Sequence, residues 1–307
     1  MNRLDEPLFS FRRPHSSARS TRPPGAFRLG IVSSVIVIGA AVFIWLMLLG
    51  PLGALFAHLS GHAIRQTLGA PGGLSPMWTS LEAAMVALTA IVLLGTPLAW
   101  LLAQGRLPFA RVIEVGLLIP LLMPPLVIGL LLIYFMGPST PIGGFLNHLH
   151  LTATNTFFAL VIALIYESAP YYILGAQAAF SSVDPQLEEN AALLGDSWPR
   201  VFRRITLPMA APGLALALAI AWARAMGAFG AVVIIAYHPY GLPMAIWVTL
   251  QEQGVGAALP YAFLLLIVAL PLPVLAYLWS ARARAKVTGT SRVRTLNVPL
   301  PDQASLA

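Results

Sequence analysis

Long apolar runs without ionisable side chains constrain the fold of this chain more than any other feature. Residues 30–56 carry no ionisable side chain, and residues 83–105 are likewise uncharged. Only 9% of the 307 residues are charged, and the mean hydropathy is +0.80, whereas about a quarter of the residues are charged in ordinary soluble domains. A helix of about 20 apolar residues crosses a bilayer. The sequence therefore predicts an all-α integral membrane protein.

Six apolar runs are long enough to cross a membrane. They lie at residues 30–56, 77–105, 109–136, 154–180, 207–236 and 257–280. The third run contains three prolines, each of which removes a backbone donor, so we expect this span to be kinked or broken. The candidate helix-break or gate residues are Pro120, Pro124 and Pro125 in this run, and Gly227 and Phe229 in the fifth. Residues 57–76 and 137–153 are expected to be external loops, the first with a short surface helix.

The basic residues predict the orientation of these six spans, which place both termini on the same side of the membrane. All but two of the 18 Lys and Arg lie in the tails or in the loops after spans two and four. The exceptions are Arg65, in an external loop, and Arg224, inside the fifth span. The positive-inside rule then places both termini in the cytoplasm. We expect a disordered tail at 1–28, a transmembrane domain at 29–281 and a basic tail at 282–307.

The loop between spans four and five is the most informative polar stretch. Residues 184–208 read DPQLEENAALLGDSWPRVFRRITLP. Asp184 precedes a proline, which is typical of a helix N-terminus. An apolar stripe at helical spacing follows, formed by Leu187, Ala191 and Leu194. Gly195 can end this helix in the left-handed conformation, and Asp196 or Ser197 can cap the next one. The pattern predicts a helix, a glycine bend and a second helix.

Two charges lie deep within consecutive spans. Glu167 is 13 positions from residue 180, and Arg224 is 17 positions from residue 207, which corresponds to roughly 20 and 25 Å of helix. The spans are antiparallel, so the two side chains lie at comparable depth, and we predict an ion pair between them. In an alternative interpretation Arg224 faces the transport pathway and offers positive charge to an anion. Glu82 and Glu114 lie nearer the span ends and are expected to be boundary residues.

Other chemistry finds little support in the sequence. The chain has no Cys, and its paired histidines, His58 with His62 and His148 with His150, belong to different loops without nearby carboxylates. No hydrolase motif and no phosphate-binding glycine loop is present. The basic residues flank the spans instead of forming a groove with aromatic residues, which argues against nucleic acid. We expect no catalytic, metal-binding or cofactor-binding residue in this chain, and therefore no enzyme.

The 184–208 segment resembles the cytoplasmic coupling segment of binding-protein-dependent ABC importer membrane subunits. Their pattern is Glu-Ala-Ala, three residues, Gly, nine residues and Ile-x-Leu-Pro, with Asn190 replacing the first Ala here. The resemblance implies that the residues coupling this chain to an ATPase are Glu188, Glu189, Ala191, Leu194, Gly195, Ile205, Leu207 and Pro208. A second interpretation is an amphipathic loop helix that lies on the membrane surface.

Further stretches extend the resemblance over residues 76–280. GTPLAWLLA, IPLLMPPLVIGLLL, YESAPYYILGAQAAFSSVD and ARAMGAFGAVVIIAY look like the membrane subunits for oxyanions, and HPYGLPMAIW looks most like molybdate and tungstate importers. Sulfate importers are similar too, so a permease for sulfate, thiosulfate or another anion is the alternative. Ala228 stands where the family usually has Glu, which puts a role for a carboxylate at that position in doubt.

The resemblance implies a type I ABC importer fold with six transmembrane helices in the bacterial or archaeal cytoplasmic membrane. It also implies a homodimer of this subunit in membrane lipid, two cytoplasmic ATPase subunits that bind ATP and Mg, and an extracytoplasmic oxyanion-binding protein. Two other classes remain open. An ion-coupled secondary transporter would keep intramembrane acidic groups, for which Glu167 alone is present, and a membrane-embedded structural or sensory anchor would give no substrate flux.

Overall fold

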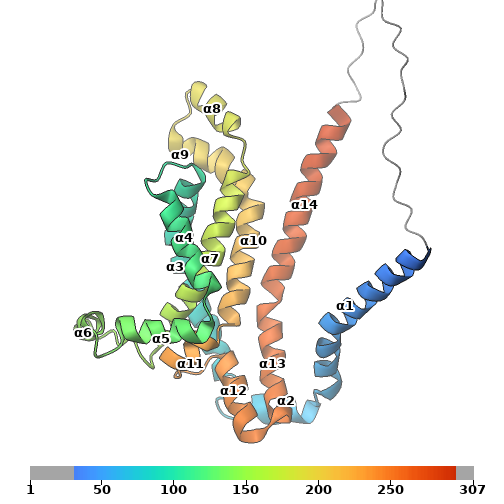
Figure 1. Cartoon of the computed structure of the whole chain (residues 1–307), viewed down its shortest axis with the longest axis vertical. Coiled ribbons are helices and arrows are strands. Elements are labelled where there is room, and N and C mark those ends of the chain that lie inside the picture. The colour runs from blue at the N-terminus through green and yellow to red at the C-terminus, as the bar shows by residue number, and fades with distance from the viewer. Residues whose placement is uncertain (1–30, 295–307) are drawn as a thin grey trace, which may run out of the picture. The chain divides into compact units, whose positions relative to one another are not determined.

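A computed structural model describes the backbone of residues 31–294 and the side chains of residues 34–283. Helices without strands make up this part of the chain (Figure 1). It divides into two units at Phe56. In the described residues, five helices are long and apolar enough to cross a membrane, or six if one bent pair counts as a single span. The predicted all-helical class is therefore confirmed.

The first unit contains most of α1 (Ile31–His58). The apolar side chains of this helix from Val35 to Leu49 are exposed. Such a surface is stable in hydrocarbon, because a helix satisfies its backbone hydrogen bonds internally. The helix agrees with the span predicted at 30–56.

The second unit contains the remaining helices. They are α2 (Gly61–Leu68), α3 (Ser75–Ala103), α4 (Ala110–Leu122), α5 (Pro125–Met136), α6 (Pro141–His148), α7 (Phe157–Ser181), α8 (Pro185–Leu193), α9 (Trp198–Val201), the π-helical turn η1 (Phe202–Thr206), α10 (Leu207–Met226), α11 (Gly230–Ile235), α12 (Leu242–Gln253), α13 (Val255–Ala269) and α14 (Pro271–Arg294). Helix α2 is the short surface helix expected in the first external loop.

Side-chain hydroxyls begin several of these helices. The hydroxyls of Ser60, Thr140 and Thr156 accept hydrogen bonds from the backbone N–H groups of Ala63, Gly143 and Ala159, at 3.1, 3.0 and 3.2 Å. These bonds satisfy donors that a helix N-terminus otherwise leaves without partners. The start of α7 at Phe157, three residues later than predicted, follows from the cap at Thr156.

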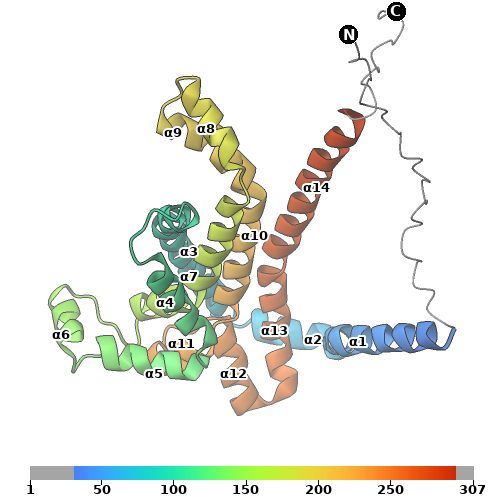
Figure 2. The same cartoon turned by 45° about the horizontal axis from the view of Figure 1, so that its top comes forward.

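Helix α7 lies between α3 and α10 in the core of the second unit (Figures 1 and 2). Glycines bring α7 and α10 into close contact. A Cβ atom on Gly175 would lie 2.8 Å from the Cβ of Ala217, and one on Gly213 would lie 2.5 Å from the Cβ of Ala179. Small residues permit this approach, which gives membrane helices their packing energy. The two helices therefore form a tightly fitted pair.

The third predicted span is broken, as its prolines indicated. Helices α4 and α5 meet at an angle of 115°. Pro120 lies inside α4, whereas Pro124 and Pro125 occupy the cap and first position of α5. Helix α5 packs against α11, where a Cβ atom on Gly129 would lie 2.7 Å from the carbonyl oxygen of Ala231. The second half of the broken span is thus packed closely against α11.

The bounds predicted for the fifth span, 207–236, are wrong at both ends. A continuous helical path runs from Trp198 to Met226 through η1. It stops at Gly227, and a separate helix, α11, begins at Gly230. The apolar composition continues across this break, so hydropathy alone concealed it. Helix α12 was also absent from the prediction, although Pro243 at its first turn and Gly254 after its end, with φ at +85°, are the usual signals of helix ends.

Candidate functional site

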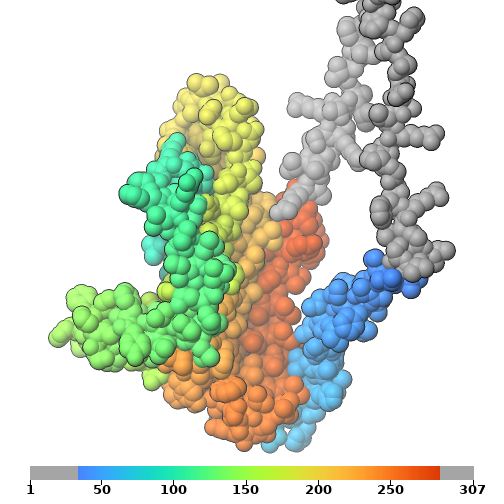
Figure 3. Space-filling view, in the orientation of Figure 1, coloured from blue at the N-terminus to red at the C-terminus, as the bar shows by residue number. Residues whose placement is uncertain are grey.

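Residues 184–208, called the coupling segment below after the motif that they resemble, form the protruding tip of the second unit beyond the ends of α7 and α10 (Figure 3). Its first helix begins as predicted, because the Asp184 carboxylate accepts a hydrogen bond from the backbone N–H of Gln186 at 3.0 Å. Gly195 follows the helix with φ at +92°, in the left-handed region that favours glycine. Ser197 occupies the cap position of α9 without a side-chain hydrogen bond. Asp196 instead pairs with Arg200 at 2.9 Å.

The predicted apolar stripe of α8 is mostly open to its surroundings. Ala191 is buried, but Leu187 is exposed, and Leu193 and Leu194 are 85% and 90% exposed. Glu189 is exposed as well. Exposed apolar side chains at a charged tip are typical of a protein–protein contact. The surface formed by Leu187, Leu193 and Leu194 is called the leucine surface below.

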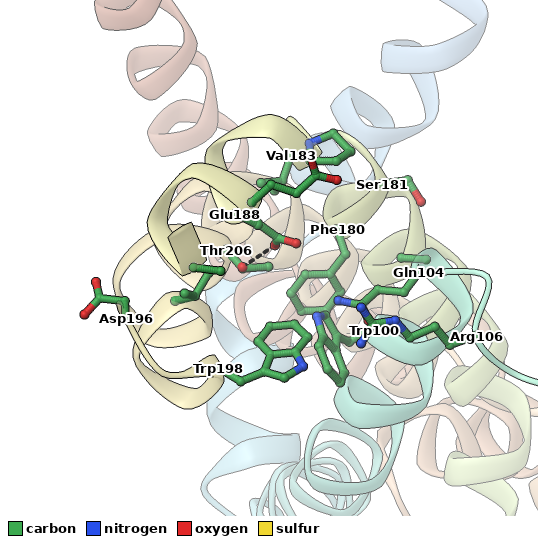
Figure 4. Close-up of a pocket in the computed structure, with 15 residues that line it drawn as sticks. Trp100, Gln104, Arg106, Phe180, Ser181, Val183, Glu188, Asp196, Trp198 and Thr206 are labelled. Carbon is green, nitrogen blue, oxygen red and sulfur yellow. Dashed lines mark hydrogen bonds between the residues drawn. The ribbon is translucent and has the colours of Figure 1, made fainter. Parts of the chain in front are cut away.

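A cavity of about 600 Å³ lies behind this tip (Figure 4). Its walls come from the ends of α3 and α7 and from α8, α9 and η1. The residues around it include Trp100, Gln104, Arg106, Phe180, Glu188, Glu189, Asp196, Trp198 and Thr206. The coupling segment therefore covers a hollow at the end of the core instead of standing apart from it.

An aromatic cluster joins the coupling segment to α3. The ring centroid of Trp100 lies 4.7 Å from that of Trp198 and 5.6 Å from that of Phe202, both in edge-to-face geometry. The guanidinium of Arg106 lies 5.6 Å from the centroid of the Trp198 ring, within the range of a cation–π contact. This cluster was not predicted, because its side chains are about 100 positions apart and no local sequence pattern shows that they meet.

A polar contact fixes α8 from its inner side. The buried hydroxyl of Thr206, in η1, donates a hydrogen bond to the Glu188 carboxylate. Of the other predicted coupling residues, Ile205 lies in η1, and Leu207 and Pro208 begin α10. The two ends of the predicted motif are therefore held together through one hydrogen bond.

The π-helical turn η1 was not predicted. Its five residues, FRRIT, connect α9 to α10 without interrupting the helical path. Such turns are rare and occur frequently at functional sites. The sequence carries no signal that distinguishes this turn from an ordinary α-helical one.

The two deep charges lie in contact. Arg224 Nη2 is 2.7 Å from Glu167 Oε2, the ion pair that their depths had suggested. Glu167 Oε1 also accepts a hydrogen bond from the backbone N–H of Ala231 at 3.2 Å. The Glu167 side chain is completely buried, whereas the Arg224 side chain is 25% exposed. One carboxylate of α7 thus holds both the end of α10 and the start of α11.

The residues next to this pair form the break between α10 and α11. Gly227 ends α10, so that Arg224 lies in the last turn of that helix instead of mid-span. Phe229 occupies the cap position before α11, and its ring centroid lies 5.5 Å from that of Trp247 in α12. Buried Ala228 lies between them. The prolines of the third span lie at a different break, and the structure brings the two breaks together where α5 meets α11.

Glu114 is more than a boundary residue. It lies in the second turn of α4, and its Oε1 accepts a hydrogen bond from Gln177 Nε2 of α7 at 2.6 Å. A hydrogen bond of 2.7 Å between the hydroxyls of Thr96 and Tyr172 also joins α7 to α3. Polar contacts therefore link α7 to α3, α4, α10 and α11.

Comparison with known proteins identifies the family. The family model described as "binding-protein-dependent transport system inner membrane component" matches residues 95–287. This chain belongs to that family. The match includes the whole coupling segment, both helix breaks and the Glu167–Arg224 pair, so these features lie within the part of the chain that matches the family. Members are components of the inner membrane, in agreement with the multi-pass architecture.

Three relatives carry assigned substrates. A probable molybdenum ABC transporter permease protein of Haloferax volcanii is 34% identical over 216 residues, which is 70% of this chain and 79% of the relative. The molybdate/tungstate permease WtpB of Thermococcus kodakarensis is 29% identical and covers 66% and 76% of the two chains. The sulfate permease CysT of Salmonella typhimurium is 29% identical and covers 73% and 84%.

Solved structures share the fold. A bacterial ABC transporter involved in the import of the acidic polysaccharide alginate has a chain that superimposes with a TM-score of 0.59 at 19% identity, over 82% of this chain and 95% of that one. At this identity the similarity concerns the fold alone. The fold is that of ABC importer permeases, as expected from the coupling segment.

Proposed function

We propose that this chain is the permease subunit of an ATP-driven importer that moves a tetrahedral oxyanion, molybdate or tungstate, into the cytoplasm. The protruding coupling segment supports this proposal most directly. It carries the leucine surface at the end of the tightly packed helices α7 and α10, in a chain that belongs to this family. The substrate class is taken from the Haloferax and Thermococcus relatives.

The coupling segment suits the transmission of movement. A partner that grips the leucine surface would pull on α8, which is joined to η1 by the Thr206–Glu188 bond and to α3 by the aromatic cluster. Close glycine contacts make α7 and α10 move together. Because packed helices shift between discrete arrangements, such a pull would alternate the access of a pathway between the two sides.

The assembly that follows contains two copies of this chain, two ATPase subunits in the cytoplasm and an external binding protein that delivers the oxyanion. ATP and Mg would bind to the ATPase subunits, where the only catalysis of the assembly takes place. The coupling segment and both termini would lie in the cytoplasm, as the distribution of Lys and Arg predicts.

A transport assay tests this proposal. Proteoliposomes that contain this chain with its ATPase, and with the binding protein outside, should accumulate molybdate or tungstate only when ATP is present inside. Uptake that persists without the ATPase would instead favour a secondary transporter. Complete absence of oxyanion uptake by the assembled complex would contradict the proposed function.

Sulfate is the second candidate substrate, because the Salmonella relative is a sulfate permease of nearly equal identity. Affinities of the purified binding protein for molybdate, tungstate and sulfate, measured side by side, separate the two. Tighter binding of sulfate by the binding protein, with sulfate uptake by the complex, would replace the first candidate with the second.

A further inference from the structure

Arg224 is partly exposed beside Glu167, which lies near the middle of α7. At such a depth an arginine side chain that faces lipid is costly. Ile220, Ala223 and Gly227, which are exposed, lie on the same face of the end of α10 at helical spacing. The open face beside Arg224 is therefore expected to border water or a second protein copy instead of lipid.

The ion pair leaves part of the guanidinium available. Both carboxylate oxygens of Glu167 are engaged, one by Arg224 Nη2 and the other by the N–H of Ala231. A guanidinium carries five N–H donors, and in the part of the chain with described side chains Arg224 has no partner other than Glu167. Glu167 thus fixes one edge of Arg224 and leaves its remaining donors for another acceptor.

We infer that Arg224 contacts the transported anion in the pathway, and that Glu167 is the residue that positions it. The inference rests on the proposed function and names a contact site for the substrate within it. A tetrahedral oxyanion presents pairs of oxygens that suit the planar, forked donors of arginine.

The same pairing explains how such a site releases its ligand. In a two-fold symmetric dimer each copy would contribute one Arg224. Each arginine is paired with its own Glu167, which offsets its charge, so the attraction for the anion is weak. Weak binding is what transport requires, because an ion that binds tightly leaves slowly.

Accessibility gives the first test, and the natural absence of cysteine makes it direct. Arg224→Cys is assembled into the full complex with partner subunits that lack accessible thiols, and is treated with a water-soluble cationic methanethiosulfonate. We expect the introduced thiol to react, and to react more slowly when molybdate is present. The matched control Ala221→Cys, three residues away but buried, should not react. An unreactive thiol in the Arg224→Cys variant would overturn the inference.

Uptake kinetics give the second test. Arg224→Gln should lower molybdate uptake about tenfold to a hundredfold, the factor for losing one charged hydrogen bond, and modification of Arg224→Cys with the cationic reagent should restore part of it. Glu167→Gln, which removes the neutralising charge, should lower both the KM and the maximal rate. If Glu167→Gln combined with Arg224→Gln transports as the unsubstituted complex does, the pair is purely structural and the inference is wrong.

The two tests also separate this inference from the proposed function. If the unsubstituted complex transports no oxyanion, the proposed function fails. If it transports molybdate and the Arg224 variants transport it equally well, only the role of Arg224 fails. ATP hydrolysis stimulated by the loaded binding protein shows in each case that the complex is assembled.

Discussion

At the scale of single residues, the ion pair between Glu167 and Arg224 was predictable from the sequence. The two residues lie at similar distances from the ends of consecutive antiparallel spans, so their side chains were expected at a common depth. The hydrogen bond from Ala231 could not be anticipated, because it depends on α11 turning back toward α7 after the break at Gly227. The Glu167 carboxylate therefore connects three helices, α7, α10 and α11, whereas the sequence predicted a contact between two.

The coupling between these residues can be measured. Glu167→Gln and Arg224→Gln should each lower the midpoint of thermal unfolding in detergent, because each leaves the remaining partner without its counter-charge. The double variant should be more stable than the sum of the two effects predicts, by at least about 1 kcal/mol. Simple additivity would show that the contact contributes nothing to stability.

At the scale of elements, patterns in the sequence predicted helices better than helix ends. The prolines at 120, 124 and 125 predicted a broken third span, since a missing donor acts locally. The fifth span was drawn through the break at Gly227–Phe229, because apolar composition continues across it, although these two residues were named as candidate break or gate residues. Contacts such as Trp100–Trp198 lay beyond prediction, since they depend on how the end of α3 meets the coupling segment.

The α7–α10 contact gives a prediction for an element. Gly213→Ala should destabilise the protein by about 1–3 kcal/mol, because its new methyl group would lie 2.5 Å from the Cβ of Ala179. Gly116→Ala in α4 is the matched control, with nothing within 4 Å of its new methyl group, and should be neutral or stabilise by up to about 1 kcal/mol. Thermal unfolding of both variants measures the difference. Equal midpoints would mean that the two helices do not touch closely.

At the scale of the whole molecule, the charge distribution and the coupling motif lead independently to one orientation. The positive-inside rule uses only Lys and Arg, and the motif uses mainly Glu, Ala, Gly and Pro. Both favour a cytoplasmic position for the loop between α7 and α10. In the proposed orientation the leucine surface would face the compartment in which ATP is available.

Assembly with the ATPase should depend on that surface. Leu194→Ser should leave thermal unfolding of the isolated chain nearly unchanged, because the side chain is exposed, but it should reduce co-purification of the ATPase. Phe145 is another exposed apolar residue, which lies in α6. The control variant Phe145→Ser should still co-purify with the ATPase. Loss of the ATPase from both variants would indicate a general defect instead of a lost contact.

Sidedness can be tested with the same positions. In intact cells, a membrane-impermeant thiol reagent should label Phe145→Cys and leave Leu194→Cys unlabelled until the membrane is permeabilised. The absence of natural cysteines removes background from this chain. Labelling of Leu194→Cys from outside would reverse the orientation and with it the proposed contact with an ATPase.

The π-helical turn at 202–206 sets the angular phase between the coupling segment and the spans. An α-helix advances about 100° per residue, and a π turn accommodates one residue more than an α turn does. Converting η1 to regular α-helix with all five residues retained would turn Trp198 by about one residue's advance, roughly 100°, around the axis of α10, whereas deletion of one residue would restore the present phase. The winding of this single turn thus sets the direction in which the coupling segment would be presented to an ATPase.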